Sequence, residues 1–117
     1  MKDLLNDILQ IDEVIGVVFL QRNGSVAFSE FRRQLSGDPE KIDWPSLVSG
    51  LGDCHETEMV FDRVRFYIRR SDSGHLVVVA GRFALIAMIR LNCDIVLPSL
   101  DAAGQKPKGL KRLFSRK

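Results

Sequence analysis

Cysteine is scarce in this 117-residue chain. Only Cys54 and Cys93 occur, and their spacing gives neither a CxxC pattern nor enough thiols for a disulfide framework. Two thiols without a framework are typical of a protein from a reducing, cytosolic compartment. A chain of this length buries enough surface to fold without a metal or disulfide scaffold. We therefore expect one cytoplasmic domain with no metal site and no cofactor.

Long hydrophobic runs are also lacking. The most apolar stretch, residues 83–97, is 15 residues long and contains Arg90, Asn92 and Asp94, whereas a membrane-spanning helix needs about 20 apolar residues. The N-terminus carries Asp3 and Asp7 within its apolar pattern, unlike the cationic start and continuous apolar core of a signal peptide. We expect neither a membrane span nor export.

Catalytic signatures are absent as well. The sequence contains no Walker pattern, GxGxxG, GxSxG or HExxH. Cys54 and His55 are adjacent, but neighbouring residues point apart and no third group is evident to orient the imidazole. The spacing of these two residues with His75 and Cys93 gives no support for zinc. We predict no catalytic residue, and hence a protein that is not an enzyme.

Charge is divided unevenly along the chain. The 17 basic and 15 acidic residues give a net charge of +2, but no acid follows residue 101. Residues 1–101 are therefore mildly acidic, and nucleic acid is not expected as a partner. We divide the chain into a domain at residues 1–101 and a flexible basic tail at residues 102–117.

The tail combines cations with a short apolar pattern. Its candidate contact residues are Lys106, Lys108, Leu110, Lys111, Arg112, Leu113, Phe114, Arg116 and Lys117. Such a segment is suited to an anionic membrane surface, where each Lys or Arg contributes about 1 kcal/mol, although it carries no acylation signal. An acidic protein or RNA would satisfy the same charges. A disordered, solubilising tail explains the composition equally well.

The first half of the chain predicts a helix, a hairpin and a second helix. Residues 3–11 have helical apolar spacing, and residues 14–21 and 25–31 flank Asn23-Gly24, which indicates a type I′ turn with both central residues at positive φ. Residues 32–41 read as a loop. Asp43 is placed to cap a helix with Pro45 in its first turn, ending at Gly52.

The second half predicts three strands and a helix. Residues 58–62 and 64–70 form adjoining strands, residues 75–80 a central strand, and residues 83–100 a helix that Pro98 kinks or ends. Arg65, Tyr67 and Arg69 share one face of their strand. They are candidate contacts for an anion or an acidic partner, and the alternative is a solvated sheet face.

The resulting αββαβββα order resembles the Roadblock family, in a Roadblock/longin-like α+β fold. The resemblance rests on residues 11–20 (IDEVIGVVFL), Asn23-Gly24, residues 76–79 (LVVV) and the start of the last helix (ALIAMIRL). It implies a five-stranded antiparallel sheet with the second helix on one face and the terminal helices on the other. Members typically dimerise by pairing their third strands and second helices, and prokaryotic members commonly regulate small Ras-like GTPases.

Mapped onto this chain, the resemblance places a dimer interface at residues 43–51 and 58–62. Its residues are Trp44, Leu47, Val48, Leu51, Met59, Val60 and Phe61. The apolar run at residues 59–61 supports this independently, because an uncovered apolar edge strand invites pairing. Tryptophan is also enriched at interface centres. The alternative is that Trp44 and the strand pack within the core of a single chain.

We therefore predict a non-enzymatic, homodimeric scaffold or regulator of a small Ras-like GTPase in a bacterial or archaeal cytoplasm. The alternative is an adaptor that uses the basic tail at a membrane surface, at the periphery of the inner membrane, or on the cytoskeleton. A third reading, a small-ligand sensor similar to profilin or PAS domains, would need an internal pocket that these densely apolar strands do not suggest.

Overall fold

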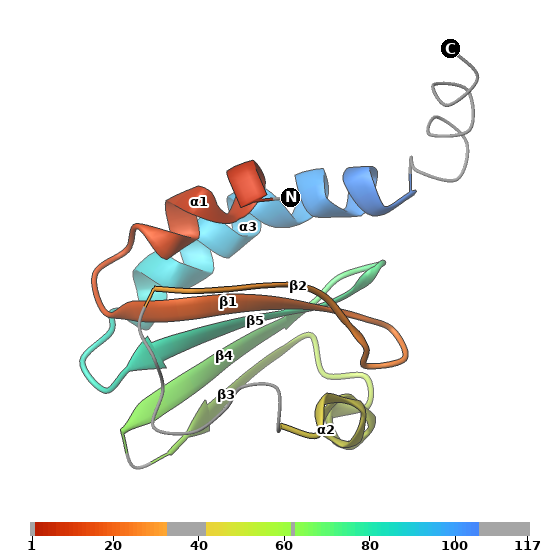
Figure 1. The fold of residues 1–117 in the computed structure, drawn as a ribbon, viewed down its shortest axis with the longest axis horizontal. Coiled ribbons are helices and arrows are strands. Elements are labelled where there is room, and N and C mark those ends of the chain that lie inside the picture. Colours follow the sequence, from red (N-terminus) through yellow and green to blue (C-terminus); the bar gives the residue numbers. More distant parts are fainter. Residues whose placement is uncertain (1, 33–41, 62, 106–117) are drawn as a thin grey trace.

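The computed structural model describes residues 2–32, 42–61 and 63–105, which form three helices and five strands (Figure 1). The elements are α1 (Lys2–Leu9), β1 (Val14–Gln21), β2 (Val26–Phe31), α2 (Trp44–Leu51), β3 (Glu56–Val60), β4 (Val64–Arg70), β5 (Gly74–Gly81) and α3 (Ile86–Gln105). The predicted αββαβββα order and α+β class are confirmed. Residues 33–41 of the predicted loop at 32–41, and the basic residues at 106–117, lie outside the described residues.

The five strands form one antiparallel sheet in the order β2-β1-β5-β4-β3. Every residue of β5 is buried, which confirms the predicted central strand. Val78 of β5 pairs with Val17 of β1 on one side and with Tyr67 of β4 on the other. β2 and β3 are left as the two edges.

Helices cover both faces of the sheet: α1 and α3 lie on one face and α2 on the other (Figure 1). Because side chains alternate along a strand, β5 contributes to both layers. Leu76 and Val78 pack with α1 and α3, whereas Val77 and Val79 pack with α2. Burying each such side chain contributes roughly 1.5–3 kcal/mol, so the sheet centre accounts for much of the stability.

The β1–β2 hairpin is confirmed, but its predicted type I′ turn is wrong. Gly24 has φ of 89°, whereas Asn23 is not among the described residues with positive φ. The backbone N–H of Gly24 donates to Gln21 O at 2.8 Å, so Arg22 and Asn23 are the central residues of the turn. Gly24 follows them in the left-handed region, the usual arrangement of a longer hairpin loop. The Asn23 side chain accepts from the backbone N–H of Ser25 at 2.9 Å, which stabilises this form instead.

The signals that the sequence gives for α2 are all present. The Asp43 carboxylate accepts from the backbone N–H of Ser46 at 3.2 Å and from its hydroxyl at 2.7 Å. These bonds lower the pKa of Asp43, the hydroxyl contributing most. Pro45 occupies the first turn, and Gly52 ends the helix with φ of 56°. A Cβ on Gly24 would lie 2.4 Å from Pro45 Cα, so the hairpin tip rests directly on α2.

The predicted bounds of two elements are wrong. β3 spans Glu56–Val60 instead of residues 58–62, because Glu56 and Thr57 already pair with β4. α3 begins at Ile86 instead of residue 83 and continues through Pro98 to Gln105, past the predicted helix end at residue 100. A proline inside a helix costs about 3 kcal/mol, and here Leu97 and Leu100 on either side of it are buried in the core and hold the helix together. Among the helices of the described residues, none combines the length and apolar composition that crossing a bilayer requires.

Candidate protein-interaction surfaces

The β3 edge exposes apolar surface. β3 lies at the end of the sheet order, and β4 is its neighbour there. Thr57 and Met59 turn towards the α2 layer, while Val60 is 71% exposed and the following Phe61 is 48% exposed. An edge strand presents unpaired backbone groups, and natural proteins usually blunt or cover such an edge. Within the described residues, this border is therefore open to pairing.

An aromatic row connects this edge to the core. The Phe61 ring meets Phe66 edge-on, with ring centres 5.0 Å apart, and Phe66 stacks with Trp44 at 6.0 Å. The backbone N–H of Phe61 donates to Val64 O at 2.8 Å, which fixes the residue at the end of β3. Phe61 is the half-exposed end of a row that begins beneath α2.

The structure places some of the predicted interface residues inside the chain. Trp44 is 4% exposed and Leu51 is 7% exposed, so both belong to the core between α2 and the sheet. The packing of Trp44 agrees with the alternative reading of the sequence, a role within the single chain. Leu47 and Val48 are half-buried beside them. The dimer stays a prediction, and the predicted residues with the most free surface are Val60 and Phe61.

The face that carries Arg65, Tyr67 and Arg69 is not a solvated sheet face. Tyr67 is 1% exposed because it lies in the layer packed under α3. One Nη of Arg65 donates to Glu58 at 3.1 Å, and the other donates to the backbone oxygen of Ala84 at 2.6 Å. The guanidinium therefore joins β3, β4 and the segment that leads into α3.

A polar cluster continues along the same face. Tyr67 Oη donates to Glu56 Oε2, and Arg90 Nε donates to the same oxygen at 2.5 Å. These two bonds, led by that of Tyr67, lower the pKa of Glu56, while burial raises the pKa of Tyr67. Arg69 Nη1 reaches Asp94 of α3 at 2.6 Å. Both candidate anion-binding arginines, Arg65 and Arg69, already have carboxylate partners, so the cluster secures α3 to the sheet.

Sequence reasoning missed the outer surface of α3. Leu85, just before the helix, and Met88, Leu91 and Ile95 within it are 48–66% exposed, and Phe83 is 78% exposed. The core instead takes Ile89, Cys93, Val96, Leu97 and Leu100. The excess of apolar positions around the helix was the available signal. This excess indicates that another layer packs on the outer side of the helix, but it does not say whether that layer comes from the same chain or from a partner.

The residues considered for thiol or zinc chemistry remain apart. Cys54 is exposed and Cys93 is buried, and burial raises the pKa of the Cys93 thiol to about 12. His55 is exposed on the surface, while His75 is 6% exposed within β5. Within the described part of the chain, no three His, Cys, Asp or Glu side chains gather as a metal site would require.

Solved structures with the same arrangement identify the fold. A structure described as MglB with a tetrameric arrangement matches with a TM-score of 0.75 and 15% identity, covering 89% of this chain and 87% of that one. The gliding protein MglB of Thermus thermophilus matches with a TM-score of 0.74, 14% identity and the same coverages. A Roadblock/LC7 domain of Streptomyces avermitilis matches with a TM-score of 0.65 and 18% identity, covering 88% of this chain and 92% of that one.

The sequence itself finds no match among models of known protein families or among curated proteins. The identities to the solved structures are low, so the likeness is one of fold. At that level the resemblance inferred from the sequence is confirmed: the chain has a Roadblock/LC7-like fold.

Proposed function

We propose that this chain, with its Roadblock/LC7-like fold, forms a homodimer through β3 and that the dimer binds and regulates a small Ras-like GTPase. The observation that carries the proposal is the open β3 edge, where Val60 and Phe61 expose apolar surface beside unpaired backbone groups. The likeness to MglB, a gliding protein, supports the choice of fold family.

Pairing of β3 with β3 of a second copy joins the two five-stranded sheets into one continuous sheet. A symmetric antiparallel pairing centred on β3 brings the two Glu58 side chains together, and like charges directly opposite one another are destabilising. Arg65 of the same chain lies 3.1 Å from Glu58 and reduces this repulsion. Glu56 is likewise bonded to Arg90. The charges along β3 therefore allow it to pair with β3 of a second copy.

The GTPase would bind the dimer on its exposed surfaces, including the outer side of α2, where Pro45, Ser46 and Ser49 are exposed. Regulation of hydrolysis needs no catalytic residue from this chain, because a partner can align the catalytic groups of the GTPase itself. Arg65 and Arg69 hold Glu58 and Asp94 within the chain, so neither is assigned as an arginine finger. The protein is a binding partner and not itself an enzyme.

The mass of the protein in solution tests the dimer. Light scattering at low protein concentration is expected to give a dimer for the natural chain and a monomer for Phe61→Asp, because the new carboxylate would be buried without a partner in the interface. The matched control is Val26→Asp, which alters a 48% exposed residue on the opposite edge strand and should leave the dimer intact. A natural chain that remains monomeric at high concentration would overturn the proposal.

Binding of the GTPase is tested separately. A small Ras-like GTPase from the same organism, loaded with a non-hydrolysable GTP analogue, should bind the natural dimer and bind Phe61→Asp at least about tenfold more weakly, as expected when a composite interface is lost. Single-turnover hydrolysis with and without the dimer measures whether the bound GTPase is stimulated. Equal binding by dimer and monomer would contradict a role for the paired sheets.

A second candidate function is an adaptor that contacts anionic lipid through the basic tail. The six cations after residue 101, without an intervening acid, favour it. Flotation with phosphatidylserine vesicles, comparing the full chain with a chain ending at residue 105, tests this candidate. Tail-dependent flotation supports the adaptor, and no flotation of either protein counts against it.

A further inference from the structure

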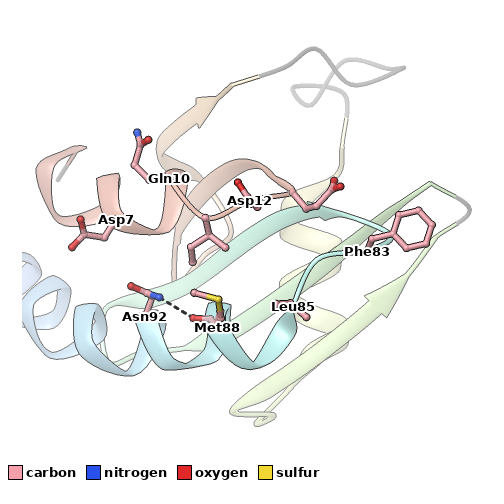
Figure 2. A pocket seen from close by; sticks show the side chains of 9 residues that line it. Asp7, Gln10, Asp12, Phe83, Leu85, Met88 and Asn92 are labelled. Carbon is pink, nitrogen blue, oxygen red and sulfur yellow. Dashed lines mark hydrogen bonds between the residues drawn. The ribbon is translucent and has the colours of Figure 1, made fainter.

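A groove of about 720 Å³ lies between α1, the turn that follows it and the start of α3 (Figure 2). Its two sides differ in chemistry. Asp7, Asp12 and Glu13 contribute carboxylates on the side of α1 and its following turn, whereas Phe83, Leu85 and Met88 contribute apolar surface on the side of α3. None of the residues that line this groove is cationic.

The apolar side of the groove continues along the surface of α3. Met88, Leu91 and Ile95 follow one another at helical spacing and are 48%, 60% and 66% exposed. Residues three, four and seven apart lie on one side of a helix, so these side chains form a single stripe that begins in the groove. We call the groove together with this stripe the α3 groove. Methionine is an adaptable contact residue, which suits Met88 to a binding surface.

We propose that the α3 groove binds the basic C-terminal segment, residues 106–117, of a second copy of this chain. The segment carries six cations and no acid, the complement of a lining with three carboxylates and no cation. Leu110, Leu113 and Phe114 recur at the i, i+3 and i+4 positions, the spacing with which an amphipathic helix places its apolar side chains into a groove. Both the charges and the apolar spacing of the segment match this surface.

The distance along α3 assigns the segment to a second copy. Met88 and Gln105 lie near opposite ends of the helix, and seventeen residues of α-helix span about 25 Å. Five residues of extended chain reach at most about 17 Å, so Leu110 cannot return to Met88 of its own chain. Nine residues reach at most about 31 Å, so Phe114 approaches Met88 of its own chain only when the segment is largely extended, which would lose the helical spacing. When the segment of each copy binds the groove of the other copy, its short reach along its own α3 no longer matters.

The inference is independent of the β3 dimer, because the α3 groove lies on the α1–α3 layer of the sheet and β3 forms one edge. The Phe61→Asp variant therefore separates the two proposals. If two copies do not pair through β3, the segment should still bind the α3 groove of another copy at protein concentrations near the dissociation constant of that contact. If the groove contact fails, the β3 dimer should persist.

Zero-length crosslinking tests the contact directly. A carbodiimide joins a lysine to a carboxylate only when the two touch, and an equal mixture of full-length natural chain and full-length ¹⁵N-labelled chain shows by mass spectrometry whether a link joins two copies. We expect links from Lys108 or Lys111 of one copy to Asp7 or Asp12 of the other. These links should also form in the Phe61→Asp background.

A double variant that keeps every amine and carboxylate provides the contrast. Leu113→Ser with Phe114→Ser should reduce the yield of inter-copy links at least about tenfold, the scale expected when the apolar anchors of an interface are removed. The matched control, Val26→Ser, removes an exposed apolar side chain on the distant edge strand and should leave the yield unchanged.

Three outcomes would overturn the inference. Links found only within one copy would place the segment on its own chain, and links that survive the double variant would show charge attraction without the apolar groove. Absence of these links in a protein that floats with phosphatidylserine vesicles would assign the segment to a lipid surface.

Discussion

Phe61 lies edge-on against Phe66, with ring centres 5.0 Å apart, yet the two residues differ sharply in burial: Phe66 is 6% exposed and Phe61 is 48% exposed. One ring belongs to the core and the other reaches the sheet border. The contact shows how a surface residue at an edge is held in place by an aromatic neighbour beneath it, leaving its outer side free.

This difference in burial predicts different costs of truncation. Phe66→Ala should lower the free energy of unfolding by about 3–5 kcal/mol, because it leaves a cavity beside Trp44. Phe61→Ala should cost only about 0.5–1.5 kcal/mol, the scale of one aromatic pair. Urea unfolding of both variants in the monomeric range of concentration measures the two values. Equal costs would mean that Phe61 is a core residue.

The bond between Tyr67 and Glu56 predicts a coupling that reaches α3. Tyr67→Phe removes the hydroxyl and should lower the free energy of unfolding by about 1–2 kcal/mol, because the bond is to a charged acceptor. In the Glu56→Gln background, Tyr67→Phe should lower the free energy of unfolding by a smaller amount. A double-mutant cycle by urea unfolding measures the coupling. Additive costs would contradict the bond.

His75 predicts a loss of stability in acid. Burial, followed by the charge of Arg70, lowers the pKa of His75, and neither ring nitrogen has a hydrogen-bond partner in the described structure. Below the ordinary histidine pKa of about 6.5, the unfolded chain binds the proton more readily than the folded one. Stability should therefore fall as the pH drops below about 6.5, by no more than about 1.4 kcal/mol per pH unit from this group.

The matched variant for this pH dependence is His75→Leu, which fills the same site without a titratable ring. Urea unfolding at pH 7.5 and pH 5.5 should show a larger loss in the natural chain than in His75→Leu. The same loss in both proteins would assign the acid sensitivity to other groups.

The two thiols predict opposite reactivities. Cys54 is exposed, whereas burial raises the pKa of Cys93 to about 12, so Cys93 is almost entirely protonated at pH 8. Ellman's reagent should therefore modify one thiol rapidly in the folded protein and the second only after unfolding. In Cys54→Ser the rapid phase should disappear. Rapid modification of Cys93 in that variant would mean that α3 opens readily from the sheet.

Local signals explain why much of the fold could be predicted. The hairpin follows from a turn sequence between two apolar runs, and α2 from Asp43, Pro45 and Gly52, all within a few residues of the structure they form. The continuous apolar run of β5 identifies a strand buried on both faces. These features depend little on the rest of the chain.

Features that depend on distant packing could not be predicted in the same way. Arg65, Tyr67 and Arg69 alternate with apolar residues exactly as a solvated face would, and only their partners on other elements, such as Asp94, show that α3 covers them. The burial of Trp44 likewise depends on Phe66, which is distant in sequence. The residue pattern along one strand shows which side chains share a face, but it does not show whether another element covers that face.

The position of β5 between β1 and β4 also governs how the chain is assembled during synthesis. In the sheet, the β1–β2 hairpin and the β3–β4 pair are joined only through β5, whose residues at 74–81 are made about sixty positions after β1 begins. Contacts of such separation slow folding. During synthesis, the two halves of the sheet can therefore be joined only after this last strand has left the ribosome.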